Sequence, residues 1–172
     1  EYDSNEVDII IGDRETDSKG QFTCTIIIPE SITGSHTITV TDESGNKPEA
    51  EFSVKPKITL SPAEQVEGKE VKVSGTGFAQ KEVITITLNG NKTPTTPLFV
   101  YTDSRGSFSA SFVAPSHDSY GTGKVEARDI YFNLAEAQLT VLAGTVTVPA
   151  ETVPAETVPA GIRLDPITSP TS

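Results

Sequence analysis

The residues best suited to chemistry are scattered along this chain. His36 and His117 are its two histidines, and neither has a partner at metal-ligand spacing or within an H-E-x-x-H motif. No G-x-S-x-G motif marks a nucleophilic serine. Both histidines are therefore expected at surface or loop positions, and the sequence predicts no enzyme.

A glycine-rich stretch, G-T-G-F-A-Q, begins at Gly75 and opens like a dinucleotide-binding fingerprint. It lacks the third glycine and a following helical pattern, both of which that fold needs to hold a pyrophosphate. Gly75 and Gly77 are instead interpreted as residues that permit a bulge or tight bend between strands. No cofactor is predicted.

Acidic turns are the best metal candidates, because carboxylate oxygens are the ligands that calcium prefers. Asp17, Asp42 and Asp103 each begin such a turn, but no complete D-x-D-x-D-G loop with a distal Glu is present. Asp, Ser, Gly and Asn are also the residues that any tight turn favours, and ordinary turns are the preferred interpretation. Asn91 begins the sequon N-K-T and is the candidate glycosylation site.

The composition narrows the function classes. A formal net charge of −11 argues against nucleic-acid binding and against an anionic membrane surface, since both need a basic patch. No apolar run approaches the length of a membrane-spanning helix, so direct membrane insertion is not expected. Abundant Thr, Ser, Val and Ile suit half-buried strands.

Alternating apolar and polar residues predict an all-β fold. Around Phe108, for example, Ala110 and Phe112 share one face while Ser109 and Ser111 share the other. Before the central region, strands are expected at residues 7–11, 22–28, 37–41 and 52–54. In the central region they are expected at 57–60, 70–74, 83–89, 98–102, 107–113, 124–129 and 137–142. No apolar period near 3.6 occurs, so almost no helix is expected.

An internal repeat is the strongest pattern in the chain. Residues 16–22, T-D-S-K-G-Q-F, align with residues 102–108, T-D-S-R-G-S-F. Further along, Asp42 aligns with Asp129, and Cys24 falls on Ala110. Cys24 is therefore expected to be a small buried apolar residue. The earlier copy lacks counterparts of residues 58–81, which should supply its first two strands, and the later copy carries an insertion near residues 91–100.

The C-terminal part has a different character. V-P-A-E-T repeats through residues 148–160 with proline at every fifth position, which forbids a helix and predicts an extended spacer. The following I-R-L-D-P at 162–166 resembles I-T-L-S-P at 58–62. The expected domains are therefore 1–55 as an incomplete repeat, 57–143 as a complete sandwich, 144–161 as a Pro/Thr-rich linker, and 162–172 as a further opening strand.

Together, I-T-L-S-P at 58–62, V-K-V-S-G-T-G-F at 71–78 and T-D-S-R-G-S-F at 102–108 resemble the IPT/TIG-type, early-set immunoglobulin-like repeats of bacterial and archaeal cell-surface and S-layer proteins. The resemblance implies immunoglobulin-like sandwiches of two antiparallel sheets, so the predicted fold class is all-β, tandem immunoglobulin-like β-sandwiches followed by the Pro/Thr-rich extended tail. It also implies a non-enzymatic, extracellular spacer or building unit of a surface layer, stalk or filament. Neighbouring copies or other surface proteins would be its partners.

Two alternatives remain open at the level of sequence. Residues 162–166 of one chain could complete the first repeat of another and build a filament, although completion within the parent chain is favoured. The protein could instead be an adhesin or carbohydrate-binding module with glycan partners. Its candidate aromatic platform is Phe99, Tyr101, Tyr120, Tyr131 and Phe132.

Overall fold

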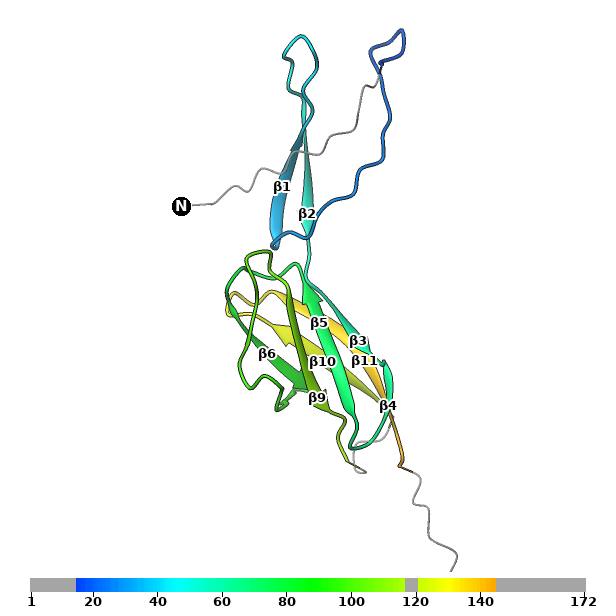
Figure 1. Ribbon diagram of the computed structural model, residues 1–172, viewed down its shortest axis with the longest axis vertical. Coiled ribbons are helices and arrows are strands. Elements are labelled where there is room, and N and C mark those ends of the chain that lie inside the picture. The colour runs from blue at the N-terminus through cyan, green and yellow to red at the C-terminus, as the bar shows by residue number, and fades with distance from the viewer. Residues whose placement is uncertain (1–14, 117–120, 145–172) are drawn as a thin grey trace, which may run out of the picture.

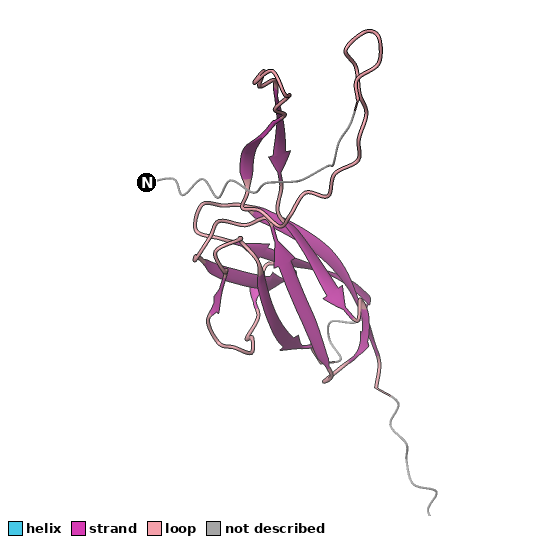
Figure 2. Cartoon of the chain, turned by 45° about the horizontal axis from the view of Figure 1, so that its top comes forward, coloured by secondary structure: helices cyan, strands magenta, loops and turns pink. Residues whose placement is uncertain are grey.

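The computed structural model describes residues 15–116 and 121–144, and within these ranges the chain forms strands, turns and loops but no helix (Figures 1 and 2). The described ranges contain eleven strands. Two of them make an isolated N-terminal hairpin, and the other nine build two sheets that face one another. The expected all-β class is therefore confirmed for the described residues. The strand expected at 7–11, His117, Tyr120 and the predicted tail from residue 145 onward lie outside them.

The smaller sheet of the sandwich has the order β3-β5-β9 and is antiparallel throughout. Its strands are β3 (Lys57–Ser61), β5 (Glu70–Thr76) and β9 (Phe108–Val113). Along β9, Phe108, Ala110 and Phe112 are buried while Ser109 is exposed, which confirms the predicted alternation.

The larger sheet has the order β4-β11-β10-β6-β7, and β8 pairs with the first two residues of β6, Val83 and Ile84. One pairing is unusual in this antiparallel fold, because β4 runs parallel to the last strand, β11. The strands are β4 (Glu64–Val66), β6 (Val83–Leu88), β7 (Asn91–Lys92), β8 (Val100–Tyr101), β10 (Gly121–Arg128) and β11 (Leu134–Leu142).

The hydrophobic core lies between these two sheets. Its most deeply buried side chains are Phe78, Leu139, Val71, Val73 and Val125, each with no more than 2% of its surface exposed. A fully buried aliphatic or aromatic side chain contributes about 1.5–3 kcal/mol through the hydrophobic effect. Every buried apolar side chain of the described residues lies between Ile58 and Val141, so the stability of the molecule resides in this sandwich.

Two glycines allow close packing at the end of the core that lies nearest the N-terminal hairpin. A Cβ at Gly75 would lie 2.1 Å from the Phe108 ring, so the absent side chain leaves room for that ring on β5. Gly106 has a φ of 75°, and a Cβ there would lie 2.0 Å from the backbone oxygen of Phe78. Phe78 and Phe108 then meet edge to face with ring centroids 5.5 Å apart. The glycine-rich stretch is thus a packing element.

The N-terminal unit consists of the hairpin β1 (Gly34–Thr39) and β2 (Glu49–Val54), preceded by an extended segment. The strand expected at residues 22–28 is wrong, because this segment makes no ladder with any described strand. Its apolar residues stay accessible: Phe22 is 39% exposed and Ile27 is 87% exposed. Cys24 is only half-buried, which corrects the expectation of a buried position.

The physical reason is the absence of a partner strand. Phe22 aligns with Phe108, at the start of β9, and β9 is held by its ladder with β5 and by one bridge from Ser111 to Thr96. No described strand lies beside residues 22–28, so they have an alternating pattern but no neighbouring backbone to pair with. A strand cannot satisfy its N–H and C=O groups without such a neighbour.

The two units meet at a short joint around Pro56. The Thr33 N–H donates to the Phe78 carbonyl oxygen across 3.3 Å, and the Ser107 hydroxyl donates to the Glu30 carboxylate across 3.0 Å. Gly77 lies directly under the linker, where a Cβ would come 2.7 Å from the Lys55 carbonyl oxygen. The hairpin therefore extends from one end of the sandwich, and the chain leaves at the other end (Figure 1).

Gly106→Ala tests the importance of the close backbone approach at Phe78. We expect it to lower the free energy of unfolding of the sandwich by about 3 kcal/mol, since left-handed strain adds to a steric clash. Gly20→Ala is the matched control, because Gly20 has a φ of 73° in the same kind of turn but nothing within 4 Å of its Cβ position. Urea denaturation followed by circular dichroism measures both. Equal effects would contradict this account of the core.

Candidate functional site

The three calcium candidates all cap turns with their own carboxylates. One carboxylate oxygen of Asp17 accepts hydrogen bonds from the backbone N–H groups of Lys19 and Gln21, at 2.8 and 2.9 Å. Asp103 does the same for Arg105 and Ser107, at 2.8 and 2.9 Å. The two aligned turns thus have the same hydrogen-bond pattern.

Asp42 caps a second kind of turn, in which it bonds the asparagine four residues later. It accepts from the Asn46 backbone N–H at 2.9 Å and from the Asn46 side-chain amide at 2.6 Å. These hydrogen bonds lower the pKa of the Asp42 carboxyl below its ordinary value. Asp129 makes the same pair of bonds to Asn133, at 3.0 and 2.7 Å.

The described residues do not bring metal-binding side chains together. No three His, Cys, Asp or Glu residues within residues 15–116 and 121–144 form a group that could hold an ion. His36 stacks on Phe52 with ring centroids 5.4 Å apart, and its Nε2 lies 2.8 Å from the Ile32 carbonyl oxygen. This histidine is therefore a packing residue of the hairpin.

The candidate glycosylation site lies on an exposed hairpin of the larger sheet. Asn91 belongs to β7, which turns back on β6 through Asn89 and Gly90. Both turn residues have positive φ values, 49° and 81°, as a tight Asn-Gly hairpin requires. Residues 91–92 therefore form an additional edge strand, in which Asn91 and Lys92 of the sequon are exposed and the following Thr93 is half-buried.

Four of the five aromatic candidates can be placed, and all four are exposed. Phe99, Tyr101, Tyr131 and Phe132 are 66%, 59%, 64% and 74% exposed. Tyr101 pairs with Val83 across β8 and β6, and the Arg128 guanidinium lies 5.1 Å from the centre of the Phe132 ring.

The register of the larger sheet connects these two aromatic positions. Thr85 pairs with Arg128, and Val83 lies two residues before Thr85 on the same outer face of β6. Tyr101 and Phe132 therefore share the outer face of this sheet near its joint with the hairpin, with Val83, Thr85 and Arg128 between them. Sequence reasoning grouped the aromatics but missed Arg128 and Val83, whose places depend on strand order.

Phe132 has an uncommon backbone conformation. Its φ is 68°, a left-handed value that costs a residue with a side chain about 1–2 kcal/mol. The aligned position in the earlier repeat is Gly45, with a φ of 82°, which adopts this conformation without strain. A bulky, solvent-exposed aromatic thus occupies a position that suits glycine.

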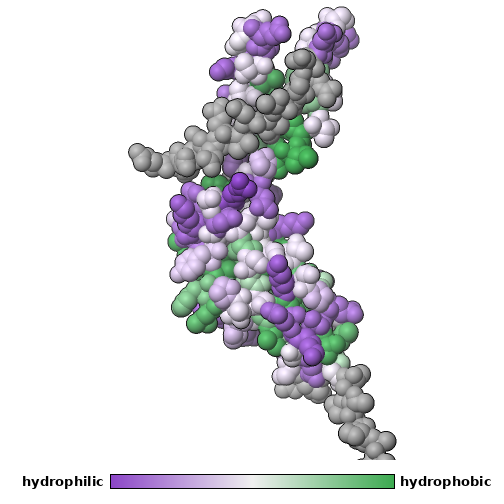
Figure 3. Space-filling view, in the orientation of Figure 1, coloured by the Kyte–Doolittle hydropathy of each residue, from purple (hydrophilic) through white to green (hydrophobic). Residues whose placement is uncertain are grey.

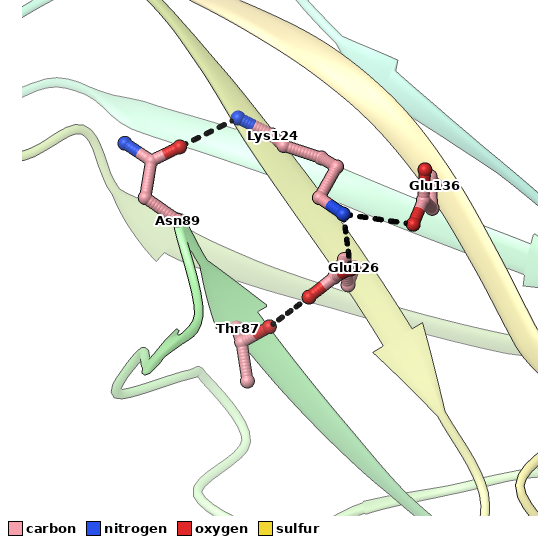
Figure 4. A network of polar contacts seen from close by, with 5 residues as sticks. All are labelled: Thr87, Asn89, Lys124, Glu126 and Glu136. Atoms are coloured by element: carbon pink, nitrogen blue, oxygen red, sulfur yellow. Dashed lines mark hydrogen bonds and ion pairs between the residues drawn. The ribbon is translucent and has the colours of Figure 1, made fainter.

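An ionic network crosses the outer face of the same sheet (Figure 4). The Lys124 ammonium lies 2.6 Å from the Glu126 carboxylate and 2.9 Å from that of Glu136. Thr87 donates a hydrogen bond to Glu126 at 3.2 Å, and Asn89 accepts one from the Lys124 backbone N–H at 2.8 Å. The network connects three neighbouring strands, β6, β10 and β11. The hydrogen bond from Lys124 is the main cause of a lowered pKa at Glu126.

The outer face of the smaller sheet carries a different feature. A hollow of about 300 Å³ is lined by hydroxyl-bearing and charged residues, among them Ser61, Lys72, Thr96, Ser109 and Ser111.

No segment described by the structure is a helix of the length and apolarity needed to cross a bilayer.

No protein-family profile matches this chain, and no curated protein matches it. Among solved structures it is similar to a Bacteroides ovatus protein, SGBP-B of the mixed-linkage glucan utilization locus, solved with a mixed-linkage heptasaccharide. The identity is 14%, the TM-score is 0.39, and the match covers 64% of this chain and 30% of that one. Murine CEACAM1b gives 14% identity and a TM-score of 0.34, with 65% and 59% covered. At these scores neither likeness supports a conclusion about function.

The ionic network predicts a small pH dependence. Because the folded pKa of Glu126 lies below its ordinary value of 4.5, its stabilising contribution is complete above that value and is lost as the pH falls through the lowered pKa. At about pH 6 the melting temperature of the wild type should therefore be higher than that of Glu126→Gln. At about pH 3 the two melting temperatures should be equal.

Glu70→Gln is the matched control for this experiment, since the Glu70 carboxylate makes no ion pair or hydrogen bond in the described structure. Melting temperatures measured in low salt across this pH range decide the point, because salt screens exposed pairs. If the melting temperature of the wild type exceeded that of Glu126→Gln by the same amount down to the lowest pH, the stabilising role of the ionised Glu126 would be contradicted.

Proposed function

We propose that this chain is a non-enzymatic, extracellular structural protein, a spacer or building unit of a cell-surface layer, stalk or filament. In this proposal, tandem immunoglobulin-like sandwiches and the Pro/Thr-rich tail separate functional parts along one axis. Neighbouring copies or other surface proteins are the partners. The net charge of −11 keeps such a chain soluble and away from nucleic acid.

The observation that carries this proposal is the parallel pairing of β4 with β11. The chain enters the sandwich at the start of β3, at one end, and leaves it after β11, at the other end (Figure 1). Thr140 donates to the Ala63 carbonyl oxygen at 2.9 Å, and Glu67 donates to the Leu142 carbonyl oxygen at 3.0 Å. End-to-end tension therefore slides these two strands past each other.

Sliding loads all the hydrogen bonds of the ladder together. Peeling would break them one after another, which needs less force. The core adds resistance because β11 also carries the buried Leu139 and Val141, which must leave the core when the strand moves. A sandwich with this arrangement of termini suits a spacer under tension.

A pulling experiment on single molecules tests this directional claim. Handles at Lys57 and Ala143 should load the β4–β11 ladder in shear, whereas handles at Lys69 and Ala143, at one end of the sandwich, should peel the same ladder. We expect a higher unfolding force for the first pair. The handles are introduced as cysteines in a Cys24→Ala background, and equal forces would contradict the proposal.

A second candidate function is carbohydrate binding by the exposed aromatic face. The specific observation is Phe132, which is held in a left-handed conformation and is 74% exposed beside Arg128. Strained residues often persist because of a role in binding, and aromatic rings can stack on sugars. Such a module would also belong on a cell surface.

The double substitution Tyr101→Ala and Phe132→Gly tests this second function. It removes both rings and should also relieve the strain at residue 132, so the melting temperature should be maintained or raised. If the face binds glycans, binding on a glycan array should fall at least about tenfold, which is about 1.4 kcal/mol. Phe99→Ala is a matched control for the loss of an exposed ring. Absence of any glycan binding by the wild type would remove this candidate.

A further inference from the structure

The N-terminal hairpin has the same register as the last hairpin of the sandwich. Gly34 pairs with Val54 and Thr39 with Glu49 in β1–β2, while Gly121 pairs with Val141 and Glu126 with Glu136 in β10–β11. Every one of these positions is related by the offset that aligns Asp42 with Asp129. The sequence repeat is therefore matched by a repeat of strand pairing.

The surrounding turns repeat as well. Gly20 and Gly106 have φ values of 73° and 75°, and the Asp-capped turns that contain them have the same hydrogen bonds. Residues 15–54 thus reproduce the turn before β9 and the first six residue pairs of the β10–β11 ladder. Among the strands that they do not contain are β3 and β5, which pair with β9 and cover this part of the complete sandwich.

No described strand pair covers the apolar face of this unit. Phe52 aligns with Leu139 and Val54 with Val141; the residues of the complete sandwich are buried, but Phe52 and Val54 are only half-buried. Ile28 is 39% exposed, whereas the aligned Ala114 is 1% exposed. Figure 3 shows hydrophobic surface on the N-terminal unit close to its joint with the sandwich.

We infer that this face binds an antiparallel strand pair with the sequence pattern of β3 and β5. The incoming second strand hydrogen-bonds to residues 22–28, as β5 does to β9, and its branched aliphatic residues cover Cys24, Phe52 and Val54. The second incoming strand must carry two branched aliphatic residues on one face, as Val71 and Val73 do in β5. It must end in G-x-G-F, as residues 75–78 do. The inference rests on the repeat architecture of the proposed function.

A chimera supplies that partner. A copy of residues 57–81 replaces residues 1–5, so that its last lysine precedes Glu6 just as Lys81 precedes Glu82. Cys24, the single cysteine, reports the result, because it aligns with Ala110, which is 4% exposed in the complete sandwich. We expect the thiol to react with a disulfide reagent at least about 100-fold more slowly than in the natural chain.

Two further variants make the test specific. A chimera with Val71→Asp and Val73→Asp in the added copy cannot cover the face and should label as fast as the natural chain. Val73→Cys in the added copy should form a disulfide with Cys24 on air oxidation, since Val73 pairs with Ala110 in the sandwich and directly opposed residues lie within disulfide range. Lys72→Cys, one residue out of register, should not.

A second chimera places the added copy before Glu1 on a flexible linker. The inference is overturned if Cys24 in both chimeras reacts as fast as in the natural chain. The sandwich must keep its own melting transition in both. It is also overturned if the natural chain already labels slowly and speeds up on dilution, since a second copy would then cover the face. Neither result affects the pulling measurement, which concerns residues 57–143 only.

Discussion

The need of every strand for a neighbouring backbone and a covered apolar face determines the structure of this protein. Where β3 and β5 are present, β9 lies in a sheet and Phe108 and Phe112 are buried. The aligned residues 22–28 have no described strand beside them, form no ladder and remain largely accessible. Similar local sequence therefore has two outcomes, because burial and pairing supply most of the stability of a strand.

Turns behave differently, because their hydrogen bonds are local. Asp17 and Asp103 cap their turns identically, although one turn precedes an unpaired segment and the other precedes a core strand. Asp42 and Asp129 show the same independence from context. The Asp42 turn joins β1 and β2 directly, so its local hydrogen bonds help to fix the register of this hairpin without a described facing sheet.

This contrast explains how much could be predicted from the sequence. Period-two patterns predicted the strands around Val71, Phe108 and Val125, since alternation reflects one buried face. The unpaired state of residues 22–28 was missed, because pattern describes a strand and says nothing of its neighbour. The parallel β4–β11 pairing and the closeness of Arg128 to Phe132 were also missed, since both depend on strand order and long-range register. The acidic turns were correctly located, but their carboxylates cap backbone groups.

The central claim is that residues 57–143 form a complete sandwich, whereas residues 22–28 lie beside no partner strand. Amide hydrogen exchange on the natural protein tests it most directly, since protection reports the free energy of local opening. The account predicts strong and cooperative protection across β5, β9, β10 and β11, modest protection in β1 and β2, and almost none in residues 22–28. Equal protection of residues 22–28 and β9 would contradict it, because residues 22–28 would then have a partner strand in this chain.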